Sequence, residues 1–209
     1  MRSIFLTGLG LFACASVAFA DDDAPSGVKL SALSGDLFNT AMQMSDPLLA
    51  IAAAKLRKQV AFTDSDLVPE GGEATPAEWT AWEEMLSVAR DLAGGDPSIL
   101  ELAEDVAAEG ARGRLESPAQ VGGAIDTGEK LIYRNVTFEG GDYAEVYVEG
   151  SGTSDLNLYI RRAGGQLVCS DSDASDRTYC GWLPEQTSAF DIEITNKGGA
   201  LNRYTLITN

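Results

Sequence analysis

DLNLYIRRAGGQLVCSDSDASDRTYC, residues 155–180, contains two strand patterns, a glycine turn and an acidic loop. The first pattern ends before Gly164-Gly165, a pair that favours a tight turn between antiparallel strands. The second pattern runs over residues 166–169, and the acidic loop follows it. We therefore expect a β-hairpin whose second strand leads into a loop closed at its ends by two cysteines.

Those cysteines, Cys169 and Cys180, are the only ones outside the N-terminal leader. An isolated pair in an exported protein favours a disulfide, since oxidising compartments keep such bonds formed. The alternative is two buried free thiols.

The first 20 residues predict a cleaved signal peptide. A basic start precedes an apolar run over residues 4–17, and Ala18-Phe19-Ala20 fits the small-x-small pattern of a cleavage site. A lipid anchor on Cys14 is the alternative, which Phe12 disfavours because small residues are usual there. We expect a protein exported to the periplasm or beyond, without membrane insertion.

The charge balance limits the partners. Fifteen basic residues stand against 32 acidic ones, a net charge of −17. Nucleic acid and anionic lipid are therefore poor partners, because both are polyanions that repel an acidic protein, and we expect no nucleic-acid binding. A protein or polysaccharide partner remains possible.

Residues 21–116 predict a helical domain of about four helices in a small bundle. The expected helices span residues 31–44, 47–58, 75–93 and the segment from residue 97 onward. Asp-Pro pairs open the second and the fourth, with the aspartate as N-cap. The sequence Thr75-Pro76-Ala77-Glu78 predicts a capping box for the third.

Trp79 and Trp82 fall on one face of that third predicted helix. Helical spacing of large apolar residues is typical of core packing. If both rings were exposed, they would instead favour a docking face for a partner protein.

The rest of the chain alternates in the manner of β-strands. We expect a linker over residues 117–127 and a sandwich domain over residues 128–209. Seven or eight short strands separated by Gly, Asn and Asp turns are typical of an antiparallel β-sandwich, here jelly-roll-like. The predicted fold is therefore α+β, with a helical domain before a sandwich domain.

Several elements of this half together resemble a known family. They are the strand after a glycine turn (residues 140–148), the segment 152–160, the hairpin into residues 167–173, Trp182-Leu183-Pro184, and the closing strand 202–209. This pattern resembles the bacterial pre-peptidase C-terminal domain. The resemblance implies a non-catalytic accessory module of secreted proteins, and some members bind calcium.

The acidic loop and the strand before it supply candidate calcium ligands. They are Asp155, Asn157, Asp171, Asp173 and Asp176. Calcium prefers six to eight oxygen ligands, which carboxylates and amides provide. The alternative is a solvated turn in which these side chains accept hydrogen bonds from their own backbone.

Histidine is absent from all 209 residues. Its absence excludes Ser-His-Asp and Cys-His catalysis and zinc proteases of the His-Glu-x-x-His kind. We therefore expect no enzyme, but a non-catalytic binding or structural accessory protein with calcium as a possible ligand. The alternatives are a periplasmic regulator or inhibitor of a partner enzyme that docks through the helical domain, and a carbohydrate-active enzyme using two carboxylates.

Overall fold

The computed structural model describes residues 25–110, 117–151 and 154–209, which form four helices and nine strands. The helices are α1 (Gly27–Met44), α2 (Pro47–Lys58), α3 (Trp82–Leu92) and α4 (Pro97–Ala108). The strands are β1 (Thr63–Asp64), β2 (Ala119–Ile125), β3 (Lys130–Phe138), β4 (Ala144–Gly150), β5 (Leu156–Arg162), β6 (Leu167–Asp171), β7 (Arg177–Trp182), β8 (Ser188–Asn196) and β9 (Asn202–Thr208). The predicted α+β class is confirmed. The predicted signal peptide, residues 1–20 with Cys14, lies outside the described residues.

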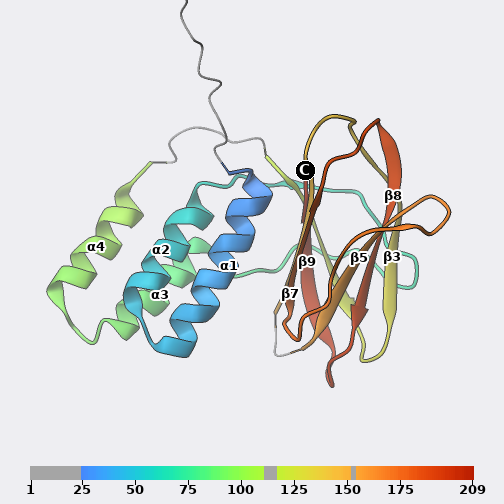
Figure 1. The fold of residues 1–209 in the computed structure, drawn as a ribbon. Helices are drawn as coiled ribbons and strands as arrows, with labels where there is room; N and C mark the ends of the chain where they lie inside the picture. The colour runs from blue at the N-terminus through green and yellow to red at the C-terminus, as the bar shows by residue number, and fades with distance from the viewer. Residues whose placement is uncertain (1–24, 111–116, 152–153) are drawn as a thin grey trace, which may run out of the picture.

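The strands form two sheets packed face to face. The first sheet has the order β1-β2-β9-β4-β7 and the second has the order β3-β8-β5-β6. All pairings are antiparallel except that of β1 with β2. In Figure 1 the four helices lie together on the outer side of the first sheet, and the second sheet lies on the far side of the sandwich.

Alternating apolar residues of both sheets fill the space between them. Phe138, Trp182 and Phe190 form an edge-to-face aromatic group at one end, with ring centroids 4.8–5.9 Å apart. Tyr133 and Tyr204 share a hydrogen bond of 2.8 Å between their hydroxyl groups inside the same core. Burial raises the pKa of Tyr133 to about 12.

The segment that we expected to be a linker, residues 117–127, contains strand β2. This strand pairs with β9 over its full length. Its Gly122 and Gly123 each let another group approach the backbone closely. A Cβ on Gly122 would collide with the Pro76 carbonyl, and one on Gly123 would collide with the Tyr204 ring.

Two predicted helix starts are confirmed, and a third lies earlier than predicted. Asp46 accepts hydrogen bonds from the amides of Leu48 and Leu49, and Asp96 caps α4 by accepting a hydrogen bond from the Ser98 amide. Helix α1 begins at Gly27 rather than at Ser31, because Ser26 accepts the hydrogen bond from the Lys29 amide.

The predicted capping box at residues 75–78 is wrong. Thr75 instead forms a β-bridge with Gly122, and Glu78 exchanges backbone hydrogen bonds with the Thr205 side chain. These contacts hold residues 75–80 against the first sheet, so α3 begins only at Trp82, without a side-chain cap. Local propensity for a helix is overridden here by pairing with strands that are distant in sequence.

Helix α1 packs closely on the outer face of the first sheet. Val28 and Ala32 contact Tyr147 and Ile207 in a small apolar cluster. Gly35 is required at this crossing, since a Cβ there would collide with the Tyr147 hydroxyl. The helical layer and the sandwich therefore share a packed interface.

A buried ion pair lies in this interface. The Arg57 guanidinium is 2.8 Å from the Glu149 carboxylate, and their side chains are 1% and 10% exposed. Arg57 also donates to the Ser34 hydroxyl and lies over the Trp79 ring, 4.4 Å from its centroid. Tyr147 donates a second hydrogen bond to Glu149. Residues from a helix, a loop and a strand are thus joined in one polar network.

Candidate functional site: an open hollow beside the first sheet

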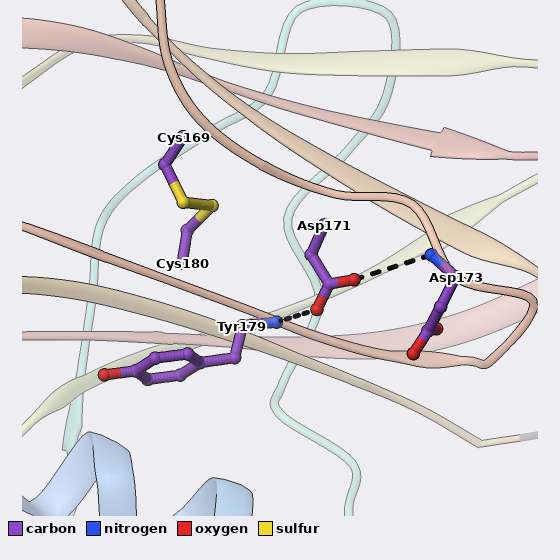
Figure 2. The surroundings of a disulfide bond; sticks show 5 residues. All are labelled: Cys169, Asp171, Asp173, Tyr179 and Cys180. Carbon is purple, nitrogen blue, oxygen red and sulfur yellow. Dashed lines mark hydrogen bonds between the residues drawn. A yellow bond between two sulfur atoms is a disulfide. The ribbon is translucent and has the colours of Figure 1, made fainter.

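The predicted disulfide is confirmed. Cys169 of β6 and Cys180 of β7 are bonded, with their Cα atoms 5.9 Å apart. The bond joins the edge strands of the two sheets, since β6 belongs to the second sheet and β7 to the first. Eleven positions separate the two cysteines in sequence, and the acidic loop lies between them (Figure 2).

The loop aspartates make hydrogen bonds to the backbone of their own turn. Asp171 accepts from the Tyr179 amide at 2.9 Å and from the Asp173 amide at 3.5 Å, as Figure 2 shows. Asp173 accepts from the Ser175 amide at 3.1 Å. Asp176 is 2.9 Å from the Arg177 guanidinium. These contacts match the solvated-turn alternative rather than a ligand shell.

The five predicted calcium ligands do not form one cluster. Within the described ranges, no three Asp, Glu, Cys or His side chains are grouped closely enough to hold a metal ion. Asp155 directly precedes β5 and Asn157 lies at its start, and each has a buried Oδ1 atom without a hydrogen-bond partner. A five-ligand calcium site is therefore not assembled by these residues.

The two tryptophans do not form an exposed pair. Trp79 lies in the extended segment before α3, with its ring 3.9 Å from that of Phe62 and against the α1 interface. Trp82 packs on the helical core, and the Lys58 ammonium lies 4.3 Å from its ring centroid. Both rings are half-buried, so the structure assigns them to packing.

A hollow of about 1070 Å³ opens beside the N-terminus of α1. Its floor is the part of the first sheet that α1 leaves uncovered. The lining includes polar, charged and aromatic side chains: Pro25, Ser26, Lys29, Thr137, Phe138, Glu139, Asp142, Tyr143, Ala144, Glu145, Tyr179 and Asn209. The outer faces of β4 and β7 thus meet the first turn of α1 and the chain between β3 and β4.

Tyr143 is the exposed aromatic residue of this hollow, with 54% of its surface accessible. Its ring and hydroxyl lie directly over Gly181 of β7, where a Cβ would collide with them. The Asn209 side chain holds the backbone here, since it donates to the Tyr143 carbonyl at 2.7 Å and accepts from the Glu145 amide at 2.8 Å. The ring is therefore supported by a neighbouring strand while it remains open to solvent.

Tyr179 forms the inner wall with Glu145 and Lys29. Its hydroxyl donates a short hydrogen bond to the Glu145 carboxylate. The Lys29 ammonium lies 4.1 Å from the centroid of its ring, a cation–π contact. Burial first, and then the bond to Glu145, raises the pKa of Tyr179 well above its usual value. The hydroxyl therefore stays protonated and remains a donor.

Glu145 is a buried carboxylate without a cationic partner. It is 4% exposed, and among the described residues its carboxylate makes a hydrogen bond to Tyr179 but no ion pair. Glu149, four positions further on the same face of β4, is 8% exposed and pairs with Arg57. The strand thus carries two buried carboxylates, one with its charge balanced and one open to the hollow.

None of these residues was among our predicted site residues. The sequence around Gly140-Gly141 indicated only a turn before a strand, flanked by acidic residues. The one available signal was the alternation of Tyr143, Glu145 and Tyr147 along that strand, which places all three on one face. Nothing local showed that α1 leaves part of this face uncovered.

No protein-family model matches this chain, and no curated protein sequence matches it. The resemblance to the pre-peptidase C-terminal domain therefore stays a prediction.

Solved structures do resemble part of the chain. A mitogen derived from Yersinia pseudotuberculosis is 13% identical, with 44% of this chain and 85% of the mitogen covered at a TM-score of 0.36. A periplasmic inhibitor of g-type lysozyme from Aeromonas hydrophila is 16% identical, with 44% and 84% covered at 0.32. A carbohydrate-binding module of a laminarinase from Zobellia galactanivorans is 14% identical, with 43% and 79% covered at 0.26. Likenesses at this level carry no argument about function.

Proposed function

We propose that this chain is an exported, non-catalytic binding protein and that the hollow beside α1 is its binding site. The observation that carries the proposal is the exposed ring of Tyr143, held over Gly181 beside the buried Glu145 carboxylate. Concave sites with an aromatic surface and a few fixed polar groups are typical of ligand binding.

The floor and one wall of the hollow belong to regular secondary structure. Its floor is formed by the paired strands β4 and β7, and one wall is the first turn of α1. Helix α1 is fixed to the sheet by the apolar cluster around Tyr147 and by the Arg57–Glu149 pair of the neighbouring helix. A preformed site loses less conformational entropy on binding than a flexible one.

Catalysis is disfavoured by the residues present. The chain has no histidine, and the cysteines Cys169 and Cys180 are bonded to each other. Export is supported by that disulfide, since such bonds persist in oxidising compartments. No helix among the described residues has the length and apolar character to cross a membrane.

Site-specific photo-crosslinking tests the proposal and works for a ligand of any chemical class. A benzophenone amino acid replaces Tyr143 in one variant and Tyr159 of β5, on the outer face of the second sheet, in the control variant. Each purified variant is irradiated with the extracellular and periplasmic fraction of the source cells. Irradiation with excess unlabelled wild-type protein as competitor measures specificity.

We expect a discrete adduct from position 143 that the competitor suppresses, and none from position 159. The proposal is overturned if the two positions give the same adducts, or if no competable adduct forms at position 143.

A further inference from the structure

We infer that the hollow receives an arginine or lysine side chain from a basic segment of a partner protein, and that Glu145 is the counter-charge. This inference rests on the proposed function, because it names the ligand class of the same site.

The first step is the state of Glu145. Removing a carboxylate from water without a cation nearby costs free energy, and buried charges in proteins are normally paired. Among the described residues Glu145 receives one hydrogen bond, from Tyr179, and no ion pair. Its 4% exposure and its place in the lining of the hollow leave it reachable from that side only. A cation entering the hollow would supply the missing partner.

The second step is the comparison with Glu149. Both carboxylates project from the same face of β4, and α1 with its neighbours covers the part that contains Glu149. There, Arg57 supplies a guanidinium at 2.8 Å and places it 4.4 Å from the centroid of an aromatic ring, that of Trp79. The hollow offers the same combination of a buried carboxylate and an aromatic ring. The Lys29 ammonium lies 4.1 Å from the centroid of the Tyr179 ring, but among the described residues no cation lies within ion-pair distance of Glu145. A partner's arginine can therefore complete it.

The third step concerns the size and charge of the ligand. Among the described residues that line the hollow, Glu139, Asp142 and Glu145 supply three carboxylates and Lys29 supplies one ammonium. They are not grouped closely enough to hold a metal ion, and about 1070 Å³ is far larger than one ion needs. A long cationic side chain fits better, since its stem can lie along the Tyr143 ring while its head reaches Glu145.

The fourth step separates a basic protein from a neutral polysaccharide. A sugar hydroxyl can donate to Glu145 but leaves its negative charge uncompensated. Two side-chain donors beside Glu145 are also already engaged, since the Asn209 amide donates to the Tyr143 carbonyl and the Tyr179 hydroxyl donates to Glu145. The net charge of −17 further attracts a basic protein over long distances.

The test uses the mature wild-type protein and a fluorescent nonapeptide of alternating arginine and serine. Binding is measured by fluorescence anisotropy at low and at high salt, with a neutral xylo-oligosaccharide and spermidine as competitors. E145Q removes the charge and keeps an acceptor for Tyr179. E83Q, at an exposed position of α3, changes the net charge by the same amount and is the matched control.

We expect E145Q to weaken peptide binding at least tenfold, since a buried ion pair is lost, and E83Q to weaken it less than about twofold. Without peptide, E145Q raises the midpoint of thermal unfolding by about 2–4 °C, because an unpaired buried charge is removed. D142N, on the exposed rim, is a second variant that keeps the fold and weakens binding about threefold.

The inference is overturned if E145Q and E83Q weaken binding equally, if the peptide does not bind at millimolar concentration, or if the oligosaccharide binds instead. If spermidine bound as tightly as the peptide, the site would be a polyamine site and the inference of a protein partner would be refuted. If a competable adduct still forms at position 143 and any of these results is found, the hollow remains the proposed binding site and only the basic ligand is refuted. If no competable adduct forms at position 143, the proposed function itself is refuted.

Discussion

Replacing Arg57 by methionine should greatly destabilise the protein, because it leaves Glu149 as a buried charge without a cation. The pair is 2.8 Å apart, with side chains 1% and 10% exposed, and Arg57 also bonds Ser34 and covers Trp79. Breaking a buried pair on one side costs about 3–5 kcal/mol. That loss is a large fraction of the roughly 5–15 kcal/mol by which a domain is stable.

Urea unfolding, followed by tryptophan fluorescence, measures this loss directly. Lys55→Met is the matched control on the same helix, since the Lys55–Glu109 pair is exposed (47% and 39%) and its loss should cost less than about 1 kcal/mol. R57M/E149Q removes the uncompensated charge as well and should recover more than half of the loss. A loss below about 1 kcal/mol for R57M, or a double variant less stable than R57M, would refute the reasoning.

Three further predictions concern the core, the acidic loop and the hollow. Burial raises the pKa of Tyr133 to about 12, so this side chain stays protonated in the folded protein at a pH where the same tyrosine ionises in the unfolded chain, near pH 10. The free energy of unfolding, measured with urea, should therefore fall above pH 10 by about 1.4 kcal/mol per pH unit for each such tyrosine. Tyr133→Phe should reduce this dependence on pH. Asp171→Ala removes the acceptor for the Tyr179 and Asp173 amides, and should lower the free energy of unfolding by about 1–2 kcal/mol, equally with calcium and with chelator. A loss of stability seen only with calcium would instead support a calcium site in the acidic loop. Gly181→Ala, introduced into the variant with benzophenone at position 143, should displace the side chain at that position and reduce competable crosslinking, because a Cβ at position 181 collides with the Tyr143 ring of the wild-type protein. Unchanged crosslinking would show that the position of this side chain is immaterial.

The elements that local chemistry determines could be predicted from the sequence. Asp46-Pro47 and Asp96-Pro97 form the N-terminal starts of α2 and α4 because the aspartate and the proline act within one turn. The disulfide and the sandwich also followed from cysteine placement and strand alternation.

The elements that distant contacts determine could not be predicted in this way. Thr75 has the sequence context of a helix cap, but Gly122, 47 positions later, draws it into a β-bridge. Residues 117–127 were expected to form a linker, whereas the role of Gly122 and Gly123 in strand β2 appears only when Pro76 and Tyr204 are placed against them. Tertiary pairing overrides local propensity at both places.

The hollow also depends on contacts between residues that are distant in sequence, so it could not be predicted either. It depends on where α1 crosses the first sheet, which the close approach of Gly35 to Tyr147 determines. Strand alternation could place Tyr143 and Glu145 on one face, but only the crossing decides that Glu149 is covered and paired while Glu145 is left open.

The most direct test of the central claim is an amide NMR titration of the mature protein with the arginine–serine peptide. The account predicts chemical-shift changes concentrated at Ser26, Lys29, Tyr143, Glu145 and Tyr179, which surround the hollow. Changes concentrated on the outer face of the second sheet, or spread evenly over the acidic surface, would contradict it.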